Sequence, residues 1–390
     1  MTVIASFART PIGKFGGAFV STSAVELGGV AIAGAMERSG LDPSAIDEVL
    51  FGHVLQAGAG QITSRQAAVR GGLPMTVPST TINKVCLSGM SAIAMADRSI
   101  RLGETSFAVA GGMESMSTAP YVLPSARWGA RMGDTALIDV MTHDGLWCAF
   151  DDCTMGESSD RKNRDLGIGR AEQDEWAAAS HARAGAAAEA FQSEIVPVSV
   201  QQRKGDPVIV TGDEGIRSDA DAEALGRLRP AFDPEGSITA GNASQISDGA
   251  AAVVLANADA ADAAGLTTVA RIVSYGQVGG TNATLHERPA EAIQVALKRA
   301  GMSVQDLDLV EINEAFAAVA LWSAGMLGID HDRVNVHGGA VALGHPLGAT
   351  GARIVVTLIN ALRSRGGGVG AAALCGGGGQ GDALIVEVSG

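Results

Sequence analysis

The stretch Asn83-Lys84-Val85-Cys86-Leu87-Ser88-Gly89-Met90-Ser91-Ala92 (residues 83–92) joins two different sequence patterns. β-Branched residues precede it over 76–82 and predict a strand. Small and apolar residues follow it over 91–102 and predict a buried helix, opened by Ser88 or Gly89. Cys86 is therefore expected at a strand-to-helix turn, where free backbone N–H groups and the helix dipole would lower its thiol pKa toward neutrality. Cys86 is a candidate nucleophile, and a buried structural cysteine is the alternative for this stretch alone.

Length and composition describe a globular chain with room for a large core. Its 390 residues are 46% hydrophobic, which suggests two or three domains. The formal net charge is −14 and no basic run occurs, which argues against nucleic acid as a partner. No run approaches about 18 apolar residues, so we expect no membrane-spanning helix. Residues 1–11 are typical of a first strand rather than of a signal peptide.

The cysteines favour a reducing, cytoplasmic setting. Cys86, Cys148, Cys153 and Cys375 are too few for a disulfide framework in a chain this long, and no two have C-x-x-C spacing. Cys148 and Cys153 have no pair of histidines nearby, so we expect no metal site.

Two parts of the chain repeat one pattern. Predicted strands and helices alternate over the first 115 residues, which is typical of a mostly parallel sheet covered on both faces. Residues 296–315 then repeat 35–54, with Gly301 at the position of Gly40. Each copy is a helix, a glycine stop, a short turn and a strand, so the sequence indicates a duplicated α/β unit.

The second repeated segment contains candidate catalytic residues. Residues 344–377 repeat 86–112, with Gly348 at the position of Gly89 and His345 at the position of Cys86, both at an offset of 259 residues. If the halves pack about a pseudo-two-fold axis, Cys86 and His345 lie at equivalent helix N-termini that can face one another. A Cys–His pair is a common way to activate a thiol nucleophile. The alternative for His345 is a polar residue at a helix start.

Between the two copies the pattern changes. Residues 118–248 contain an Ala-rich helical segment (170–191) and polar loops, and we interpret them as a loop domain inserted over the sheet, where α/β proteins bind ligands. A strand over 249–256 is expected to return to the first half. The predicted division is therefore 1–117 plus 249–268, then 118–248, then 269–390.

Cys375 ends the apolar run 369–374 and enters four glycines, Gly376 to Gly379. This is the carboxyl end of a predicted strand, where the glycines would let backbone N–H groups approach a ligand and form an oxyanion hole. The glycines lack a following GK[ST], which excludes a phosphate-binding P-loop. The alternative for Cys375 is a packing residue of the strand.

Together these stretches resemble the thiolase family, and within it the acetyl-CoA acetyltransferases. The matching motifs are NKVCLSGMSA (83–92), GGMESMS (111–117), TAGNASQISDGAAA (239–252), NEAFA (313–317), GGAVALGHPLGATGAR (338–353) and LCGGGGQGDA (374–383). The resemblance covers nearly the whole chain. It implies the thiolase fold, in which duplicated α/β units form an α/β/α/β/α arrangement with an inserted loop domain.

The resemblance also implies a reversible Claisen condensation of two acetyl-CoA to acetoacetyl-CoA and CoA. Cys86 would be the acyl-accepting nucleophile, His345 its activator and a stabiliser of the enolate, and Cys375 the acid/base for the methyl of the second acetyl-CoA. Asn313 would hold a water that completes an oxyanion hole with His345. The backbone N–H groups of Cys86 and Gly377 would form the other oxyanion hole.

The remaining implied residues bind the substrate, coenzyme A thioester, and no other cofactor is expected. By resemblance, the pantetheine is lined by Leu146, Met155, Phe232, Ala240 and Ser244, the adenine lies beside Arg217, and the acyl pocket is walled by Ala315 and Phe316. The family implies a homo-oligomer. The stretch 121–146 resembles the loop through which tetrameric members pair their dimers.

Two departures from the family pattern concern the substrate contacts. Thr154 stands where many biosynthetic thiolases have a pantetheine-contacting histidine, and 284–289 (TLHERP) replaces a Met-Gly-x-Gly-Pro segment near the acyl pocket. His286 is either a pocket residue or a loop histidine.

Four alternatives stay open. A degradative 3-ketoacyl-CoA thiolase of broader chain length would use the same catalytic residues. A ketosynthase would pair its cysteine with two histidines, where this chain has Asn313 and Cys375. A non-catalytic acyl-CoA-binding scaffold would have lost catalytic residues that are present here, and a thiol hydrolase would need no second cysteine.

Overall fold

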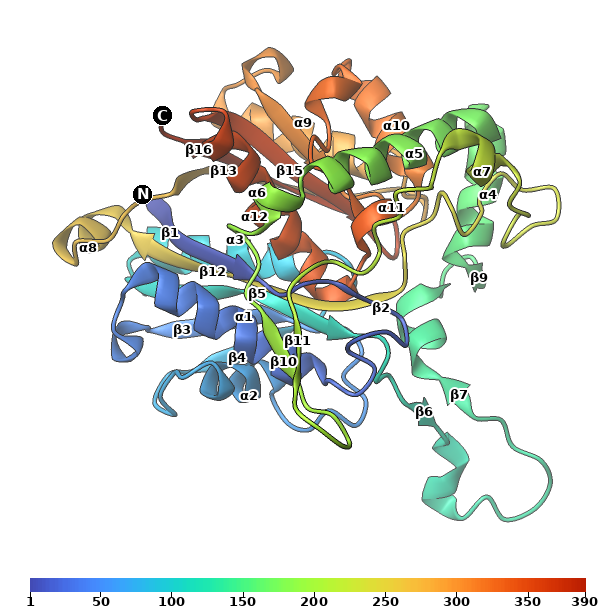
Figure 1. The fold of residues 1–390 in the computed structure, drawn as a ribbon, viewed down its shortest axis with the longest axis horizontal. Helices are drawn as coiled ribbons and strands as arrows, with labels where there is room; N and C mark the ends of the chain where they lie inside the picture. Colours follow the sequence, from blue (N-terminus) through green and yellow to red (C-terminus); the bar gives the residue numbers. More distant parts are fainter.

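The computed structural model describes residues 1–390 and is built around one ten-stranded mixed sheet in the order β14-β15-β16-β13-β1-β12-β5-β3-β4 (Figure 1). The strands of its amino-terminal half are β1 (Thr2–Arg9), β3 (Glu48–Gly52), β4 (Ser79–Ile82), β5 (Phe107–Ser115) and β12 (Ser247–Asn257), with the short β2 (Gly13–Lys14) paired to β12. Those of the carboxyl-terminal half are β13 (Ala270–Gly279), β14 (Leu309–Ile312), β15 (Gly368–Gly376) and β16 (Gln380–Val388).

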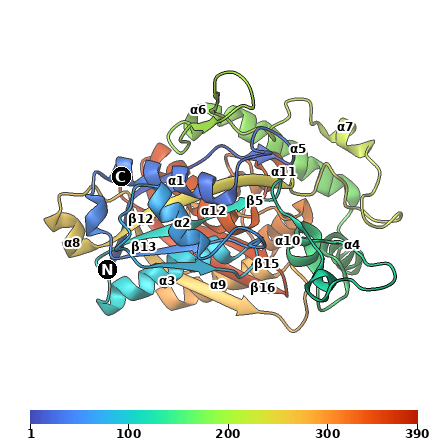
Figure 2. The same cartoon turned by 90° about the horizontal axis from the view of Figure 1, so that it is seen from below.

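Helices form three layers around the two halves of the sheet (Figures 1 and 2). The outer layer on the amino-terminal half holds α1 (Ala24–Ser39) and α2 (Thr63–Arg70). The outer layer on the other half holds α9 (Arg288–Ala300) and α10 (Ala317–Leu327). Between the halves lie α3 (Ser88–Leu102) and α12 (Leu347–Ser364). The expected α/β/α/β/α layering of the thiolase fold is confirmed.

Alternating side chains explain why the strands can separate two helical layers. In β12, Val253 and Leu255 belong to the central hydrophobic cluster with α3 and α12, while Ala252 and Val254 between and beside them belong to the outer cluster with α1. Successive side chains of a strand point to opposite faces, so a strand buried on both faces reads as a continuous apolar run.

The expectation of a mostly parallel sheet is wrong. Only the β3–β4, β3–β5 and β14–β15 pairs are parallel. Strand β12 returns from the inserted segment and pairs antiparallel with both β1 and β5, and β16 pairs antiparallel with both β13 and β15. Strand direction depends on which strands become neighbours, and local apolar runs do not encode that.

The two halves have matching elements, as the repeat predicts. Gly40 and Gly301 both end their helices in the left-handed conformation, with φ of 68° and 69°. α3 and α12 start at Ser88 and Leu347, an offset of 259 residues. β5 and β15 start at Phe107 and Gly368, an offset of 261 residues, so Cys375 occupies the position that Glu114 has in the first half.

The central helices approach each other and β5 through their backbones. A Cβ on Gly89 would lie 2.8 Å from the carbonyl oxygen of Gly348, and a Cβ on Gly112 of β5 would lie 1.9 Å from the same atom. Only glycine allows such contact. The close approach brings the N-termini of α3 and α12, and hence Cys86 and His345, to one place.

The segment 118–248 lies mainly outside these layers. It contains β6 (Tyr121–Val122), β7 (Ile138–Asp139), β8 (Trp147–Cys148), β9 (Cys153–Thr154), α4 (Met155–Leu166), α5 (Arg170–Ala186), α6 (Ala188–Phe191), β10 (Val198–Val200), β11 (Val208–Val210) and α7 (Ala222–Gly226). The Ala-rich helix expected over 170–191 is interrupted at Ala187. The three-domain division itself stays a prediction.

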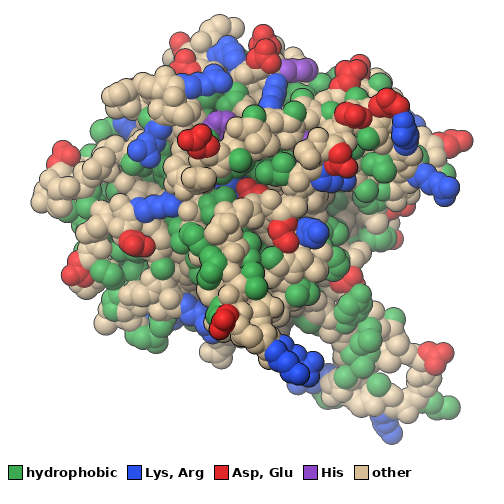
Figure 3. Space-filling view, viewed as in Figure 1, with side chains coloured by type: hydrophobic (Ala, Val, Ile, Leu, Met, Phe, Trp, Pro, Cys, Tyr) green, Lys and Arg blue, Asp and Glu red, His purple; other side chains and the backbone are tan.

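Residues 121–139, which we call the arm, extend from the body of the molecule (Figures 1 and 3). The arm exposes large apolar side chains, with Trp128 82% and Met132 99% exposed. Two short helices complete the chain, α8 (Ala258–Ala263) and α11 (Ala340–Leu343). None of the helices combines the length and apolar character needed to cross a membrane.

Candidate active site

Cys86 lies in a tight turn between β4 and α3, as the sequence predicts. Val85 before it has φ of +49°, an unusual conformation for a β-branched residue. The Ser88 hydroxyl holds the turn, because its Oγ accepts from Lys84 N at 2.8 Å and donates to Val85 O at 2.6 Å. The turn therefore presents the sulfur at the N-terminal end of a buried helix.

His345 precedes α12 at the equivalent point of the second half. Its backbone N–H donates to Gln245 O at 3.0 Å, and its Nδ1 lies 2.6 Å from Thr350 Oγ1. The Thr350 hydroxyl donates its proton to Pro346 O at 2.9 Å, so it accepts from an Nδ1–H group. This pattern assigns the proton of the neutral ring to Nδ1 and leaves Nε2 unprotonated, so that it can act as a base.

Cys375, at the end of β15, completes a small pocket with the two residues above. The cavity has a volume of about 60 Å³. Its lining residues are Cys86, Gly145, Leu146, Met155, Ser244, Leu285, Ala315, Phe316, His345, Leu347, Cys375, Gly376 and Gly377. The structure thus brings together both cysteines, the histidine and Gly377 from separate parts of the chain.

Burial sets the charge of the central groups. It raises the pKa of the Cys86 thiol to about 12, although N–H groups of Cys86 and Gly377 act in the opposite direction. Burial, with a smaller effect of the Arg353 charge, lowers the pKa of His345 to about 3. Burial also raises the pKa of Cys375.

The expectation of a Cys86 pKa near neutrality is therefore wrong. The helix N-terminus and the two N–H groups do favour the thiolate, but removal of the sulfur from water outweighs them. Both partners are neutral at rest, a thiol and an imidazole that line the same small pocket. The arrangement can move a proton from Sγ to Nε2 when a substrate carbonyl arrives.

Asn313 lies beside His345 at the end of β14. Its Nδ2 is 3.4 Å from His345 Nε2, and its backbone N–H donates to Ala373 O at 2.9 Å. Its Oδ1 is buried without a hydrogen-bond partner. A buried, unpaired acceptor is costly, so this atom is suited to hold a water or substrate donor.

The structure places only some of the expected coenzyme A residues in the pocket. Leu146, Met155, Ser244, Ala315 and Phe316 line it. Phe232 lies next to the pocket, because its ring packs edge-on against that of Phe316 with centroids 6.2 Å apart.

Ala240 and Arg217 lie outside the pocket lining and are exposed. The Arg217 side chain lies against His181, with Nη2 3.4 Å from His181 Nε2. Contacts of these two residues with coenzyme A stay a prediction.

The structure shows where the two residues that depart from the family pattern, Thr154 and His286, lie. Thr154 is the N-cap of α4, where its Oγ1 accepts from Glu157 N at 3.2 Å. His286 does not line the pocket: it is a loop histidine in the turn before α9, and it is fully buried, with Nε2 2.7 Å from Asn163 Oδ1. Its neighbour Leu285 lines the pocket instead.

Sequence reasoning missed four residues of the lining. Gly376 and Leu347 adjoin residues that were predicted, so the motifs already pointed to them. Gly145 lies near the end of the stretch that resembles the tetramer-pairing loop, and Leu285 belongs to the segment 284–289 expected near the acyl pocket, so the sequence pointed to these segments but not to the two residues. Their side of the pocket depends on how the inserted segment packs on the second half.

The fold and this site define a thiolase. A model of the thiolase N-terminal domain matches residues 2–259 and one of the thiolase C-terminal domain matches residues 266–388, so the chain belongs to the thiolase family.

Individual relatives are similar over their full length. The chain is 52% identical over 388 residues to the probable acetyl-CoA acetyltransferase of Mycobacterium tuberculosis, covering 99% of each chain. It is 50% identical over 388 residues to the acetyl-CoA acetyltransferase of Escherichia coli, covering 99% of this chain and 98% of that one. The crystal structure of the Bacillus anthracis acetyl-CoA acetyltransferase superposes with a TM-score of 0.95 at 42% identity, covering 99% and 98% of the two chains.

Proposed function

We propose that this chain is an acetyl-CoA C-acetyltransferase, which condenses two acetyl-CoA to acetoacetyl-CoA and CoA and catalyses the reverse cleavage. The observation that carries the proposal is the shared pocket of Cys86, His345, Cys375 and Gly377. Relatives named acetyl-CoA acetyltransferase, at about half identity over their full length, support it. The substrate is itself a coenzyme A thioester, so no further cofactor is needed.

In the first half-reaction, Cys86 Sγ attacks the thioester carbonyl and its proton passes to His345 Nε2. The backbone N–H groups of Cys86 and Gly377 donate to the oxyanion. Loss of one such donor typically costs about 3–4 kcal/mol of barrier. The CoA thiolate leaves with the proton of Cys375, so the acyl-enzyme holds a Cys375 thiolate and a His345 imidazolium.

In the second half-reaction, the Cys375 thiolate takes a proton from the methyl group of a second acetyl-CoA. Imidazolium Nε2–H and a water held by Asn313 donate to the enolate oxygen. The enolate carbon attacks the acyl group on Cys86, and the departing Cys86 thiolate recovers its proton from His345. Every group then has its starting protonation state, and ping-pong kinetics follow.

The size of the pocket favours a short acyl group. Its volume is about 60 Å³, and Leu285, Ala315 and Phe316 form part of its apolar wall. This favours acetyl transfer over the alternative of a degradative thiolase for long 3-ketoacyl chains.

The test compares thiolysis of acetoacetyl-CoA and of a ten-carbon 3-ketoacyl-CoA, with Cys86→Ala as the inactive control. We expect activity on the four-carbon substrate alone, and none in the variant. Equal or faster cleavage of the long chain would assign a broad degradative thiolase. An inactive wild type would leave only an acyl-CoA-binding scaffold.

Assembly and location are part of the proposal. We propose a homotetramer, a dimer of dimers, in the reducing cytoplasm. The apolar side chains exposed on the arm, Trp128 and Met132 among them, support a contact between copies.

A further inference from the structure

Glu314 is a buried carboxylate for which the mechanism above has no use. It follows Asn313 directly and is 1% exposed. Its Oε1 accepts from Trp176 Nε1 and Asn335 Nδ2, each at 2.9 Å. Its Oε2 accepts from Ser180 Oγ at 2.8 Å and from Val341 N at 3.0 Å. Two donors converge on each oxygen, so the carboxylate is fully occupied by the protein.

These donors come from separate segments of the chain. Trp176 and Ser180 lie on α5 of the inserted segment, whereas Asn335 and Val341 belong to the second half. The fit is tight, because a Cβ on Gly339 would lie only 2.4 Å from the Glu314 carboxyl carbon. One side chain therefore connects α5 to the loop that carries Asn313.

Asn335 strengthens this connection from the other side. It accepts from Ile312 N and donates to Ile312 O, both at 2.8 Å, as well as bonding Glu314. Residues 312–314 are thus held on both sides of Asn313. The Asn313 side chain lies within 3.4 Å of His345 Nε2, so a small shift of this loop changes the geometry where the enolate oxygen would bind.

His345 does not depend on Glu314 in the same way. Its ring is held by Thr350, and its backbone N–H donates to Gln245 O. The link to Glu314 is indirect: Gln245 Nε2 donates to the carbonyl oxygen of Val341, whose N–H donates to Glu314. Loss of the Glu314 interactions should therefore displace Asn313, its direct neighbour in the chain, more than the Cys86–His345 pair.

We propose that Glu314 is the positioning residue for Asn313, and that it serves the enolate step rather than the acyl-transfer step. This inference rests on the proposed function. Glu314 touches neither substrate nor reacting atoms and acts only through the loop that it anchors to α5.

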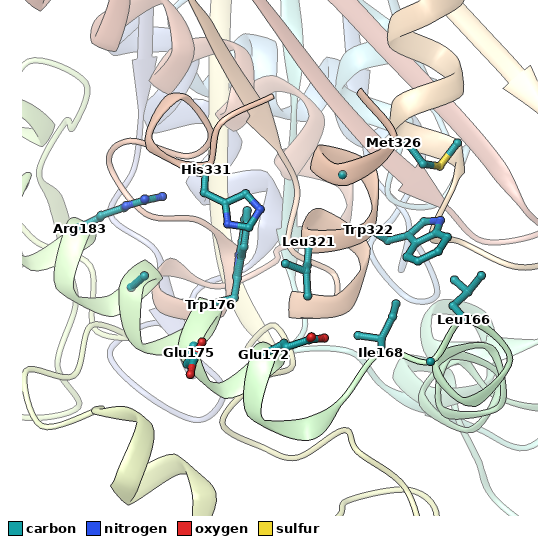
Figure 4. A pocket seen from close by; sticks show the side chains of 13 residues that line it. Leu166, Ile168, Glu172, Glu175, Trp176, Arg183, Leu321, Trp322, Met326 and His331 are labelled. Carbon is teal, nitrogen blue, oxygen red and sulfur yellow. The ribbon is translucent and has the colours of Figure 1, made fainter. Parts of the chain in front are cut away.

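Trp176 extends the connection to the surface. It forms part of the wall of an open cavity of about 810 Å³ between α5 and α10, in which its ring packs edge-on against His331 with centroids 5.0 Å apart (Figure 4). Glu175 lines the same cavity but is exposed and has no part in the Glu314 network. Glu175→Gln is therefore a control for Glu314→Gln, because it also changes one carboxylate to an amide.

The experiment uses Glu314→Gln, which keeps the shape of the side chain. NH₂ at the Oε1 position would face two N–H donors, Trp176 and Asn335, and NH₂ at the Oε2 position would face Val341 N–H, although Ser180 Oγ can turn to accept there. At least one of the four hydrogen bonds is therefore lost. We expect condensation and thiolysis to fall about 10²-fold, the usual effect of a small misplacement at a reacting centre. Exchange of labelled CoA into acetyl-CoA needs only the first half-reaction and should fall less than about threefold.

Further variants separate positioning from general stability. Glu175→Gln should keep both rates. Trp176→Phe and Ser180→Ala each remove one donor and should lower condensation about three- to tenfold without affecting exchange. In the Glu314→Gln background, at least one of Trp176→Phe and Ser180→Ala should cost less than it does alone, because one of these two side chains faces the NH₂ group and has already lost its carboxylate acceptor.

The outcomes are distinct. Equal loss of condensation and exchange in Glu314→Gln, or no loss of either, would overturn the inference. A wild type that performs exchange but no condensation, or neither, would overturn the proposed function instead.

Discussion

At the residue scale, the protonation of Cys86 is the feature most open to measurement. Burial raises its pKa to about 12, so the thiol stays protonated until the pH approaches that value. We expect alkylation of Cys86 by iodoacetamide to accelerate about tenfold per pH unit from pH 7 to 10, since only the thiolate reacts. Mass spectrometry of the Cys86 peptide, with Cys86→Ser reporting background labelling, checks this. A plateau above pH 7 would show a preformed thiolate.

His286 makes a second prediction, on stability. Burial lowers its pKa to about 4, and the nearby Glu287 and Lys162 have smaller and opposite effects. The unfolded state therefore binds this proton more tightly, so the free energy of unfolding falls as the pH drops from 6.5 to 4. The loss amounts to about 3 kcal/mol.

Urea unfolding of His286→Gln checks this value. Its amide can still donate to Asn163 Oδ1, and it has no proton to gain. Between pH 6.5 and 4 the variant should lose about 3 kcal/mol less than the wild type. His143→Gln, at an exposed residue, is the control. Identical pH dependence of His286→Gln and wild type would contradict the prediction.

The residues of the site could be found from sequence because they lie in motifs at matching places of a repeat. Cys86 and His345 lie 259 positions apart at equivalent helix starts. The direction of the Cys86 pKa shift could not be found that way. It depends on the burial of Cys86 in a pocket whose lining comes partly from distant segments, as Leu285 and Gly145 do.

At the scale of elements, the crossing of α12 with β5 predicts a sharp contrast between two glycines. Gly112→Ala would place a Cβ 1.9 Å from Gly348 O, three residues from His345, so we expect a loss of about 3 kcal/mol or more and reduced activity. Gly185→Ala on α5 meets no atom within 4 Å and should stabilise the protein by up to about 1 kcal/mol. Calorimetry of both variants measures the change in unfolding free energy. Equal changes in Gly112→Ala and Gly185→Ala would contradict the close crossing of α12 and β5.

Elements were predictable where local signals are strong. The glycine stops at Gly40 and Gly301 and the helices before them agree with the structure. The antiparallel placement of β12 and β16 was not predictable, because pairing between distant strands leaves no local signal.

At the scale of the whole molecule, the arm predicts a change of assembly. Replacing Trp128 and Met132 by Glu puts charge on its most exposed apolar side chains. We expect light scattering to report a smaller oligomer than for wild type. Leu102→Glu, at an apolar side chain 75% exposed on the body, is the comparison. An unchanged mass of the arm variant would remove the arm from the interface.

The position of strand β13 between the two terminal strands makes the chain suitable for circular permutation. Arg271 pairs with Val3 of β1 on one side and with Glu387 of β16 on the other, so the two ends of the chain lie about two strand spacings, or 10 Å, apart. A linker of a few residues could join them, and new ends could be opened between α8 and β13. In such a circular permutant the half that contains His345 would be translated before the half that contains Cys86. The layers of the folded molecule would stay the same.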